Sequence, residues 1–206
     1  MLTIDGLNQF YGGSHTLWDV ALTVPAGSRT CVMGRNGMGK TTLLKCVMGL
    51  LPAASGAVTF EGMDLSRLPA ESRARRGIRK NGPRTIPSRI FDLFPVLREM
   101  LRRRGGDLSG GQQQQLAIGR ALVLEPRLLI LDEPTEGIQP NIVHEIGDII
   151  LKLNREAGVT ILLVEQKLAF ARRVASEFHI LEKGRRVAGG AIAGLTDSVV
   201  REHLSV

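Results

Sequence analysis

The sequence contains few aromatic residues, few cysteines and no long apolar run. Aromatic side chains make up only 4% of the 206 residues, while 43% of all residues are hydrophobic. A core therefore has to be built mainly from leucine, isoleucine, valine and alanine. No apolar stretch approaches the roughly 18–20 residues that a membrane-spanning helix needs. The opening residues, MLTIDGLNQF, lack the basic-then-apolar layout of a secretory signal, so we expect any membrane association to come through a partner.

Only two cysteines are present, Cys31 and Cys46, and both lie in apolar segments. They show neither the CxxC nor the Cys/His spacing of metal sites and redox motifs. The sequence therefore predicts two reduced, buried thiols in a cytosolic protein.

Acidic residues are scarce in the middle of the chain. The whole sequence has 27 Lys and Arg against 20 Asp and Glu, a formal charge of +7, and eleven basic residues face two acids between Arg73 and Arg104. Three interpretations stay open: a solvated basic surface, a face that lies near anionic lipid headgroups, and a nucleic-acid track. The sequence argues against the last, because aromatic side chains do not alternate with the charges as base stacking requires.

The first 62 residues predict an antiparallel sheet. The segments LTIDGLNQFYG, LWDVALTV and GAVTFEG are bounded by glycine or Pro-Ala-Gly turns and are typical of short strands. Between them, the apolar run SRTCVMG ends at Gly34, and a helical pattern follows from Lys40 to Leu50. This order predicts a strand, a glycine loop and a helix.

Two later segments, 127–133 and 159–165, are continuous apolar runs typical of strands that are buried on both faces. Between them, apolar residues at three-to-four spacing follow Pro140 and predict a helix. A strand, a helix and a strand in this order predict a right-handed crossover in a parallel sheet. A hairpin that turns at Lys183-Gly184 and a short helix from about Thr196 follow.

The segment from Pro69 to Gly106 differs from the rest of the chain. It is charged, contains Pro83, Pro87 and Pro95, and predicts one helix over about Arg89–Arg103. We interpret this segment as a helical insertion in the sheet domain.

The glycine loop has the sequence GRNGMGKT and matches G-x-x-x-x-G-K-[ST] with a strand before it and a helix after it. Glycines are needed because the backbone must curl around phosphates with several N–H groups pointing inward. We expect Lys40 to neutralise the β- and γ-phosphates and the Thr41 hydroxyl to bind Mg²⁺. The residues predicted to contact ATP here are Gly34, Arg35, Asn36, Gly37, Met38, Gly39, Lys40, Thr41 and Thr42.

The segment LLILDE, residues 128–133, is an apolar strand that ends in two acids. We expect Asp132 to emerge beside the glycine loop and to hold Mg²⁺ through water. Glu133 points differently and is the candidate general base that polarises the attacking water.

A second candidate phosphate contact is LSGGQ at 108–112, a Ser-Gly-Gly turn that opens an apolar-periodic helix. With the glycine loop and LDEP in this order, it resembles the signature motif of ATP-binding cassette (ABC) proteins, and the resemblance covers almost the whole chain. In that family the signature closes over the γ-phosphate held by the P-loop of a second, head-to-tail subunit. The resemblance therefore implies that another subunit's ATP contacts Ser109, Gly110, Gly111 and Gln112.

The same resemblance assigns roles to other positions. Tyr11 lies where an aromatic side chain stacks on adenine, and TEGIQP (135–140) lies where the D-loop communicates across the dimer. Gln166 occupies the switch position, where many ABC ATPases have histidine. Branched-chain amino acid and urea type cassettes resemble this sequence in having glutamine there. A glutamine can hydrogen-bond the γ-phosphate but cannot act as a charged acid. The candidate catalytic residues are thus Glu133, Gln166 and Lys40.

One departure from the family lies at the junction of Ile78 and Arg79. The family would continue there into a strand that ends in a glutamine, the Q-loop, which touches Mg²⁺ and couples to the membrane subunits. A few tens of residues are missing at this point, either as a stretch left out of the chain or as a true deletion. A true deletion would put turnover and coupling in doubt.

The resemblance implies an α/β P-loop NTPase fold of the ABC ATPase type, with a mostly parallel core sheet and an antiparallel N-terminal β-subdomain. We expect one domain over 1–206, in which 1–68 and 124–206 form the RecA-like core and the β-subdomain. Residues 69–123 form a shortened helical subdomain that ends in the signature helix.

The resemblance is greatest to the ATPase subunits of importers for urea, which are similar to those for branched-chain amino acids. It implies a subunit that binds ATP and Mg²⁺ and hydrolyses ATP on the cytoplasmic, inner face of a bacterial membrane. The implied partners are a second ABC ATPase subunit, two membrane permeases and, indirectly, a periplasmic or extracellular substrate-binding protein, with no nucleic acid. Two alternatives stay open: a nucleotide-binding subunit deficient in hydrolysis, and a soluble ABC ATPase outside transport.

Overall fold

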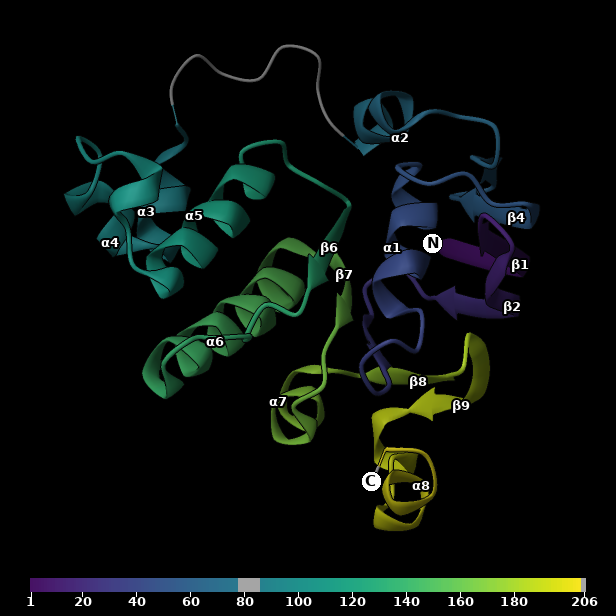
Figure 1. Cartoon of the computed structure of the whole chain (residues 1–206). Helices are drawn as coiled ribbons and strands as arrows, with labels where there is room; N and C mark the ends of the chain where they lie inside the picture. Colours follow the sequence, from purple (N-terminus) through teal and green to yellow (C-terminus); the bar gives the residue numbers. More distant parts are fainter. Residues whose placement is uncertain (78–85, 205–206) are drawn as a thin grey trace.

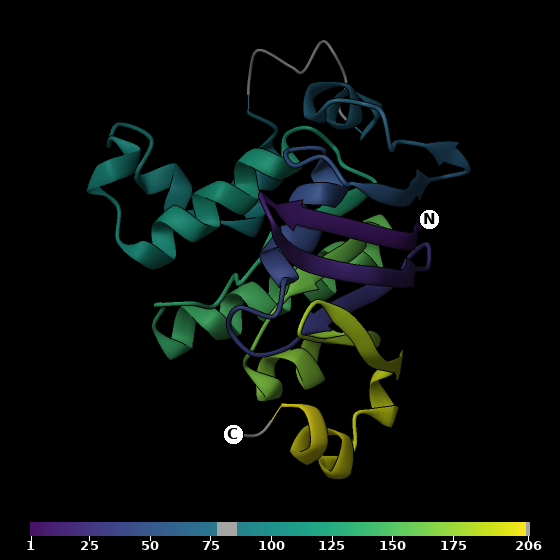
Figure 2. The ribbon, with the colours of Figure 1, turned by 45° about the vertical axis from the view of Figure 1, so that its right-hand side comes forward.

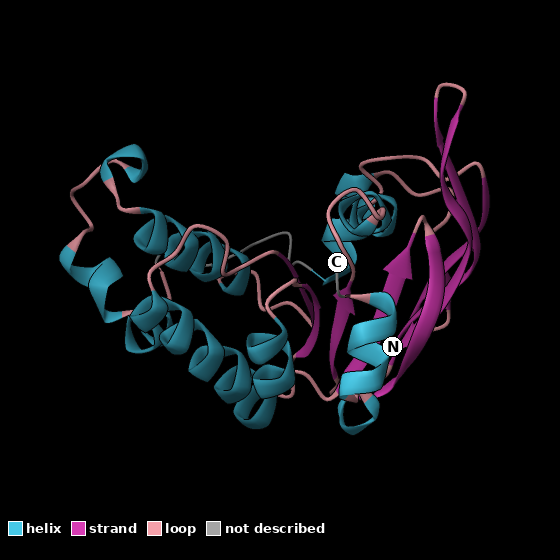
Figure 3. Cartoon of the chain, turned by 60° about the horizontal axis from the view of Figure 1, so that its bottom comes forward, coloured by secondary structure: helices cyan, strands magenta, loops and turns pink. Residues whose placement is uncertain are grey.

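The computed structural model of the chain describes residues 1–77 and 86–204. Figure 1 shows two groups of elements, with helices α3 to α6 on one side and strands β1, β2 and β4 on the other. Figure 3 shows the same division, with the strands gathered on one side and a group of helices extending from the other. None of the helices in the described ranges is long and apolar enough to cross a membrane.

The first sheet is antiparallel, as the sequence predicts. Its strand order is β2-β1-β4-β5, and Leu2 of β1 lies between Val24 of β2 and Phe60 of β4. The strands are β1 (Leu2–Tyr11), β2 (Ser14–Val24), β4 (Ser55–Phe60) and β5 (Met63–Asp64).

The second sheet forms the centre of the molecule and has the order β6-β7-β3-β8-β9. Its first four strands are parallel, and only β9 runs antiparallel to β8. The predicted parallel pair and the hairpin at Lys183-Gly184 are thereby confirmed. The strands are β3 (Arg29–Met33), β6 (Leu128–Asp132), β7 (Thr160–Val164), β8 (Glu177–Glu182) and β9 (Arg185–Ala191).

Alternate residues of the central strands belong to two separate cores. Cys31 of β3 packs with helices α6 and α7, whereas Val32 packs with α1 and the antiparallel sheet. This alternation follows from the two-residue period of a strand, and it explains why the strands read as continuous apolar runs. Figure 2 shows β1 and β2 lying across α1. Both cysteines are buried and unpaired, as predicted.

Four helices pack around the central sheet or follow it. Helix α6 begins at Pro140, as expected, and Thr196 caps α8 through a hydrogen bond from the Val199 N–H. The helices are α1 (Lys40–Met48), α6 (Pro140–Ala157), α7 (Leu168–Val174) and α8 (Asp197–His203), with a short 3-10 turn at Ile192–Gly194.

The expected single helix over Arg89–Arg103 is wrong. The structure has two short helices, broken at Phe94, whose backbone leaves the helical conformation (φ −132°, ψ 74°). The break follows from Pro95, since proline lacks an N–H and disfavours the helical conformation of the residue before it. The helical elements of this region are α2 (Ala70–Gly77), α3 (Ser88–Leu93), α4 (Pro95–Glu99), a 3-10 turn at Gly105–Asp107 and α5 (Gly110–Leu122). The predicted Ile78–Arg79 junction lies outside the described residues.

Strand β6 lies at the edge of the central sheet within the described ranges. The Arg127 carbonyl and the Glu133 N–H both bond to the β7 side, at 3.0 Å each. Backbone groups alternate sides along a strand, so those of Leu128, Ile130 and Asp132 point away from β7. A mainly apolar cavity of about 380 Å³ adjoins this strand.

Candidate functional site

The loop between β3 and α1 is shaped by three glycines. Gly37 and Gly39 have φ of 78° and 96°, values that side-chain-bearing residues rarely adopt. Gly34 has φ of 149°, and a Cβ atom there would lie 2.3 Å from the Leu181 carbonyl oxygen. The loop therefore passes so close to β8 that only glycine fits, and it leads directly into the first turn of α1.

The N-terminus of α1 is open to an anion. Gly39 caps the helix without a side-chain hydrogen bond, and the first turn contains no acid. Free N–H groups and the helix dipole favour a negative charge there. Lys40 folds back over the loop, where its Nζ donates to the carbonyls of Gly34 (2.8 Å) and Arg35 (2.9 Å). Burial lowers the pKa of Lys40, and Glu133 partly offsets this shift.

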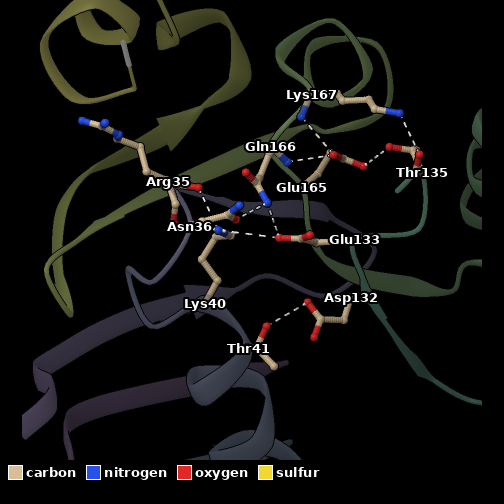
Figure 4. Close-up of polar contacts among 11 residues, drawn as sticks. Arg35, Asn36, Lys40, Thr41, Asp132, Glu133, Thr135, Glu165, Gln166 and Lys167 are labelled. Atoms are coloured by element: carbon tan, nitrogen blue, oxygen red, sulfur yellow. Dashed lines mark hydrogen bonds and ion pairs between the residues drawn. The ribbon is translucent and has the colours of Figure 1, made fainter. Parts of the chain in front are cut away.

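Thr41 and Asp132 meet at the edge of this loop, as Figure 4 shows. The Thr41 Oγ1 lies 3.5 Å from Asp132 Oδ1. Burial raises the pKa of Asp132, which the Thr41 hydroxyl opposes. Hydroxyl and carboxylate oxygens are ligands that Mg²⁺ accepts alongside phosphate and water. Within 1–77 and 86–204, no group of three or more His, Cys, Asp or Glu side chains could hold a metal ion.

Glu133 lies at the centre of a second set of contacts (Figure 4). Its Oε1 accepts a hydrogen bond from Gln166 Nε2 at 2.6 Å and lies 3.7 Å from Lys40 Nζ. The same Gln166 nitrogen donates to Asn36 Oδ1 at 2.7 Å. Both amide hydrogens of Gln166 are therefore used, and they join the carboxylate to the glycine loop. Glu133 itself has φ of 46°, a left-handed backbone conformation that side-chain-bearing residues rarely adopt.

The contact between two buried polar residues in this network was not predicted from the sequence. Glu165 is 2% exposed and Thr135 is fully buried, and the Thr135 hydroxyl donates to Glu165 Oε2 at 2.6 Å. The available signal was a charge directly after the apolar run VTILLV. Such a charge needs buried partners, but the sequence does not show which residues supply them.

The remaining loop residues lie around these contacts. Asn36 and Arg35 are exposed and Thr42 is buried. Met38 lies against the β8–β9 turn, since its carbonyl accepts the Gly184 N–H at 3.2 Å.

Tyr11 lies at the end of β1, where it pairs with Ser14, and is 48% exposed. A neighbouring aromatic stack was not predicted. The His15 ring stacks on Phe10 and on Trp18, with centroids 4.0 and 3.5 Å apart. Tyr11 is thus free to stack against a planar ligand.

The segment at 108–112 lies apart from the glycine loop. Ser109 caps α5 in a capping box, in which its Oγ accepts the Gln112 N–H and Gln112 Oε1 accepts the Ser109 N–H. A cavity of about 850 Å³ opens there, and its lining includes Ser109–Gln112 and Gly137–Gln139 but none of residues 34–42. The two predicted phosphate contacts are therefore not brought together within one chain.

A sequence model of the ABC transporter family matches residues 17–87 and 89–136, more than half of the chain. This chain belongs to that family. The ABC ATPase is 37% identical to the high-affinity branched-chain amino acid transport ATP-binding protein BraG of Pseudomonas aeruginosa, over 98% of each chain. It is 36% identical to a probable branched-chain amino acid transport ATP-binding protein, LivF, of Archaeoglobus fulgidus, over 99% of this chain and 98% of the relative.

Solved structures agree with this assignment. The ABC ATPase superimposes on MJ1267, an ATP-binding cassette of an ABC transporter, with a TM-score of 0.85 and 25% identity over 98% of this chain and 97% of that one. The ADP conformation of the same cassette gives a TM-score of 0.81 and 27% identity over the same shares. The predicted α/β cassette fold is therefore confirmed, and the chain is an ABC-type ATPase.

The alignments with BraG and LivF are longer than this chain. Each alignment runs over 231 positions, whereas this ABC ATPase has 206 residues, so at least 25 positions have no counterpart here. Both relatives are named for branched-chain amino acid transport and neither for urea.

Proposed function

We propose that this chain binds Mg-ATP and hydrolyses it to energise an importer, and that it does so at a site shared by two copies. The observation that carries the proposal is the position of Glu133, whose carboxylate is held at the mouth of the glycine loop by Gln166 and faces the Lys40 ammonium. A carboxylate in this position is a general base within reach of the end of a triphosphate.

Different residues of the site bind the phosphates, the adenine ring and Mg²⁺. The N–H groups of residues 34–42 and the Lys40 ammonium hold the phosphates, while Tyr11 stacks on the adenine ring. Thr41, directly, and Asp132, through water, would hold Mg²⁺, which would neutralise phosphate charge. Gln166 orients Glu133 through its amide N–H and supplies no charge of its own.

The signature segment completes the site of a second copy. Ser109 and Gln112 are held by the capping box, so the first turn of α5 is rigid and presents N–H groups toward open space. Docked head-to-tail on another copy, this helix start adds donors and a dipole to the γ-phosphate. Nucleotide thereby holds the dimer together, and hydrolysis releases it.

The partners outside the dimer are two membrane permeases at the inner face of the cell membrane and, through them, a substrate-binding protein. Residues 69–123 form the shortened helical subdomain that meets the permeases. Four arginines near its tip are exposed and suit a surface close to anionic lipids: Arg98, Arg102, Arg103 and Arg104. The relatives favour a branched-chain amino acid as the transported solute, whereas the resemblance of the sequence to ATPase subunits of urea importers favours urea.

The proposal includes slow ATP turnover, because the chain lacks the segment that the family has at Ile78–Arg79. Within the described ranges β6 has a partner on one edge only, and relatives have at least 25 further positions. The family's strand to the Q-loop would fit that edge. We infer that the 206-residue chain binds ATP normally but hydrolyses it slowly and without stimulation by permeases.

The test is phosphate release by the chain, with and without reconstituted permeases of the urea and branched-chain types. Insertion of the family's segment at Ile78–Arg79 should restore stimulation with one permease type, which identifies the solute. Full stimulated turnover from the 206-residue chain would overturn the role given to the missing segment. Absence of ATP binding would overturn the proposed function itself.

A further inference from the structure

Glu165 is a buried carboxylate directly after β7, next in sequence to Gln166. It is 2% exposed, and a buried carboxylate is strongly unfavourable unless donors surround it. Three donors do so: Oε1 accepts the backbone N–H groups of Gln166 (2.7 Å) and Lys167 (2.9 Å), and Oε2 accepts the Thr135 hydroxyl (2.6 Å). Figure 4 shows all three converging on it.

These contacts join two loops that are distant in sequence. Thr135 lies two residues after Glu133 in the loop that follows β6, and Gln166 lies in the loop that follows the neighbouring strand β7. A second hydrogen bond joins the same two loops, because Lys167 Nζ donates to the Thr135 carbonyl at 2.7 Å. The loop after β6 is therefore fixed at two points to the segment 165–167, through the Glu165 carboxylate and the Lys167 ammonium.

These contacts fix the backbone of Gln166 and therefore the position from which its side chain extends. Its amide donates to both Glu133 and Asn36, and these bonds require the backbone at 166 to stay in place. Beyond Thr135, the same loop continues to Gly137–Gln139, which line the cavity at the start of α5. A shift of this loop would move the Thr135–Glu165 bond and with it the Gln166 backbone.

We propose that Glu165 is a positioning residue that holds Gln166 against Glu133 and links it to the loop of residues 134–139. The role rests on the proposed function, since Glu133 has to act on the water that attacks ATP. The carboxylate of Glu165 accepts hydrogen bonds from Gln166, Lys167 and Thr135, so it acts on Glu133 through the Gln166 backbone.

The matched pair of variants is Thr135→Val and Thr160→Val. Both threonines are buried, and both replacements remove one hydroxyl at nearly constant shape. Thr160 lies at the opposite end of β7 and accepts the Gly27 N–H at 2.9 Å, so Thr160→Val controls for loss of stability alone. Glu165→Gln keeps an oxygen for the two N–H groups, whereas Glu165→Ala leaves both without a partner.

The first readout does not need turnover. Amide hydrogen exchange by NMR should become roughly tenfold faster or more at Gln166 and Lys167 in Thr135→Val and Glu165→Ala, as expected when bonds to a buried charge are lost. Glu165→Gln should restore most of the protection, and Thr160→Val should leave it unchanged. Unchanged exchange at Gln166 in Glu165→Ala would overturn the proposed tie, whether or not the chain hydrolyses ATP.

The second readout is a double-mutant cycle that combines Thr135→Val with Gln166→Ala. The measured quantity is kcat, and the Kd for ATP shows whether nucleotide binding has changed. Thr135→Val should lower kcat roughly tenfold while Kd changes less than twofold, and it should have no further effect in the Gln166→Ala background. If Thr135→Val lowered kcat by the same factor with and without Gln166→Ala, Glu165 would have only a structural role, and the positioning role would be overturned. If the unmodified chain has no turnover, the proposed function fails and the exchange readout alone decides the role of Glu165.

Discussion

Replacing Lys40 with alanine should abolish measurable ATP binding. The Lys40 side chain is 4% exposed, and its ammonium donates to two carbonyls of the glycine loop, at 2.8 and 2.9 Å, so the charge is held at this loop. Removing one partner of such a desolvated charge pair costs about 2–5 kcal/mol. At about 1.4 kcal/mol per factor of ten, this weakens binding roughly 30- to 5,000-fold.

Isothermal titration with Mg-ATP measures the loss. Lys45→Ala is the matched control, because Lys45 lies on the same helix but is exposed, and it should bind like the unmodified chain. A thermal melt checks that Lys40→Ala is folded. Unchanged affinity in a folded Lys40→Ala chain would refute the assignment of the glycine loop as the phosphate site.

Three further predictions test other parts of the structure. Glu133→Gln keeps the contact with Gln166 but removes the base, so turnover should fall roughly 10²–10⁴-fold while ATP still binds; unchanged phosphate release would show that Glu133 is not the base. Gly34→Ala should lower the free energy of unfolding by about 1–3 kcal/mol, because its Cβ would collide with the Leu181 carbonyl, and an unchanged denaturation midpoint would contradict this. His179 donates to the Thr23 carbonyl, and burial lowers its pKa. Below about pH 6.5 the unfolded chain therefore binds more protons than the folded chain. The free energy of unfolding should consequently fall as the pH drops from 7.5 to 5. His179→Gln should lose less stability over that range, and an equal loss in urea denaturation would contradict the assigned cause.

Local patterns were sufficient for most of the fold. The continuous runs at 127–133 and 159–165 identify parallel strands because both faces are covered, by α6 and α7 on one side and by α1 on the other. The start of α1 follows from Gly39 and Lys40 alone, since the motif sets the backbone conformation. The break at Phe94 was also readable from Pro95, and the single helix predicted there overlooked it.

The site was only partly predictable, because its contacts join distant segments. Glu133 and Gln166 could be assigned individually, yet the hydrogen bond between them spans two strands that pair only in the folded chain. The Thr135–Glu165 bond is likewise 30 residues apart in sequence. The capping box of Ser109 and Gln112 is different, since its S-x-x-Q spacing is local and was available as a helix-start signal.

The central claim is that ATP is held between the glycine loop of one copy and Ser109 of another. The most direct measurement is light scattering with Mg-ATP on Glu133→Gln chains that also carry either Lys40→Ala or Ser109→Asp. Aspartate still caps α5 but repels phosphate. Each double variant alone should stay monomeric, and their mixture should form a dimer that holds one ATP, because only one composite site is intact. Dimers from either double variant alone, or none from the mixture, would contradict the shared site.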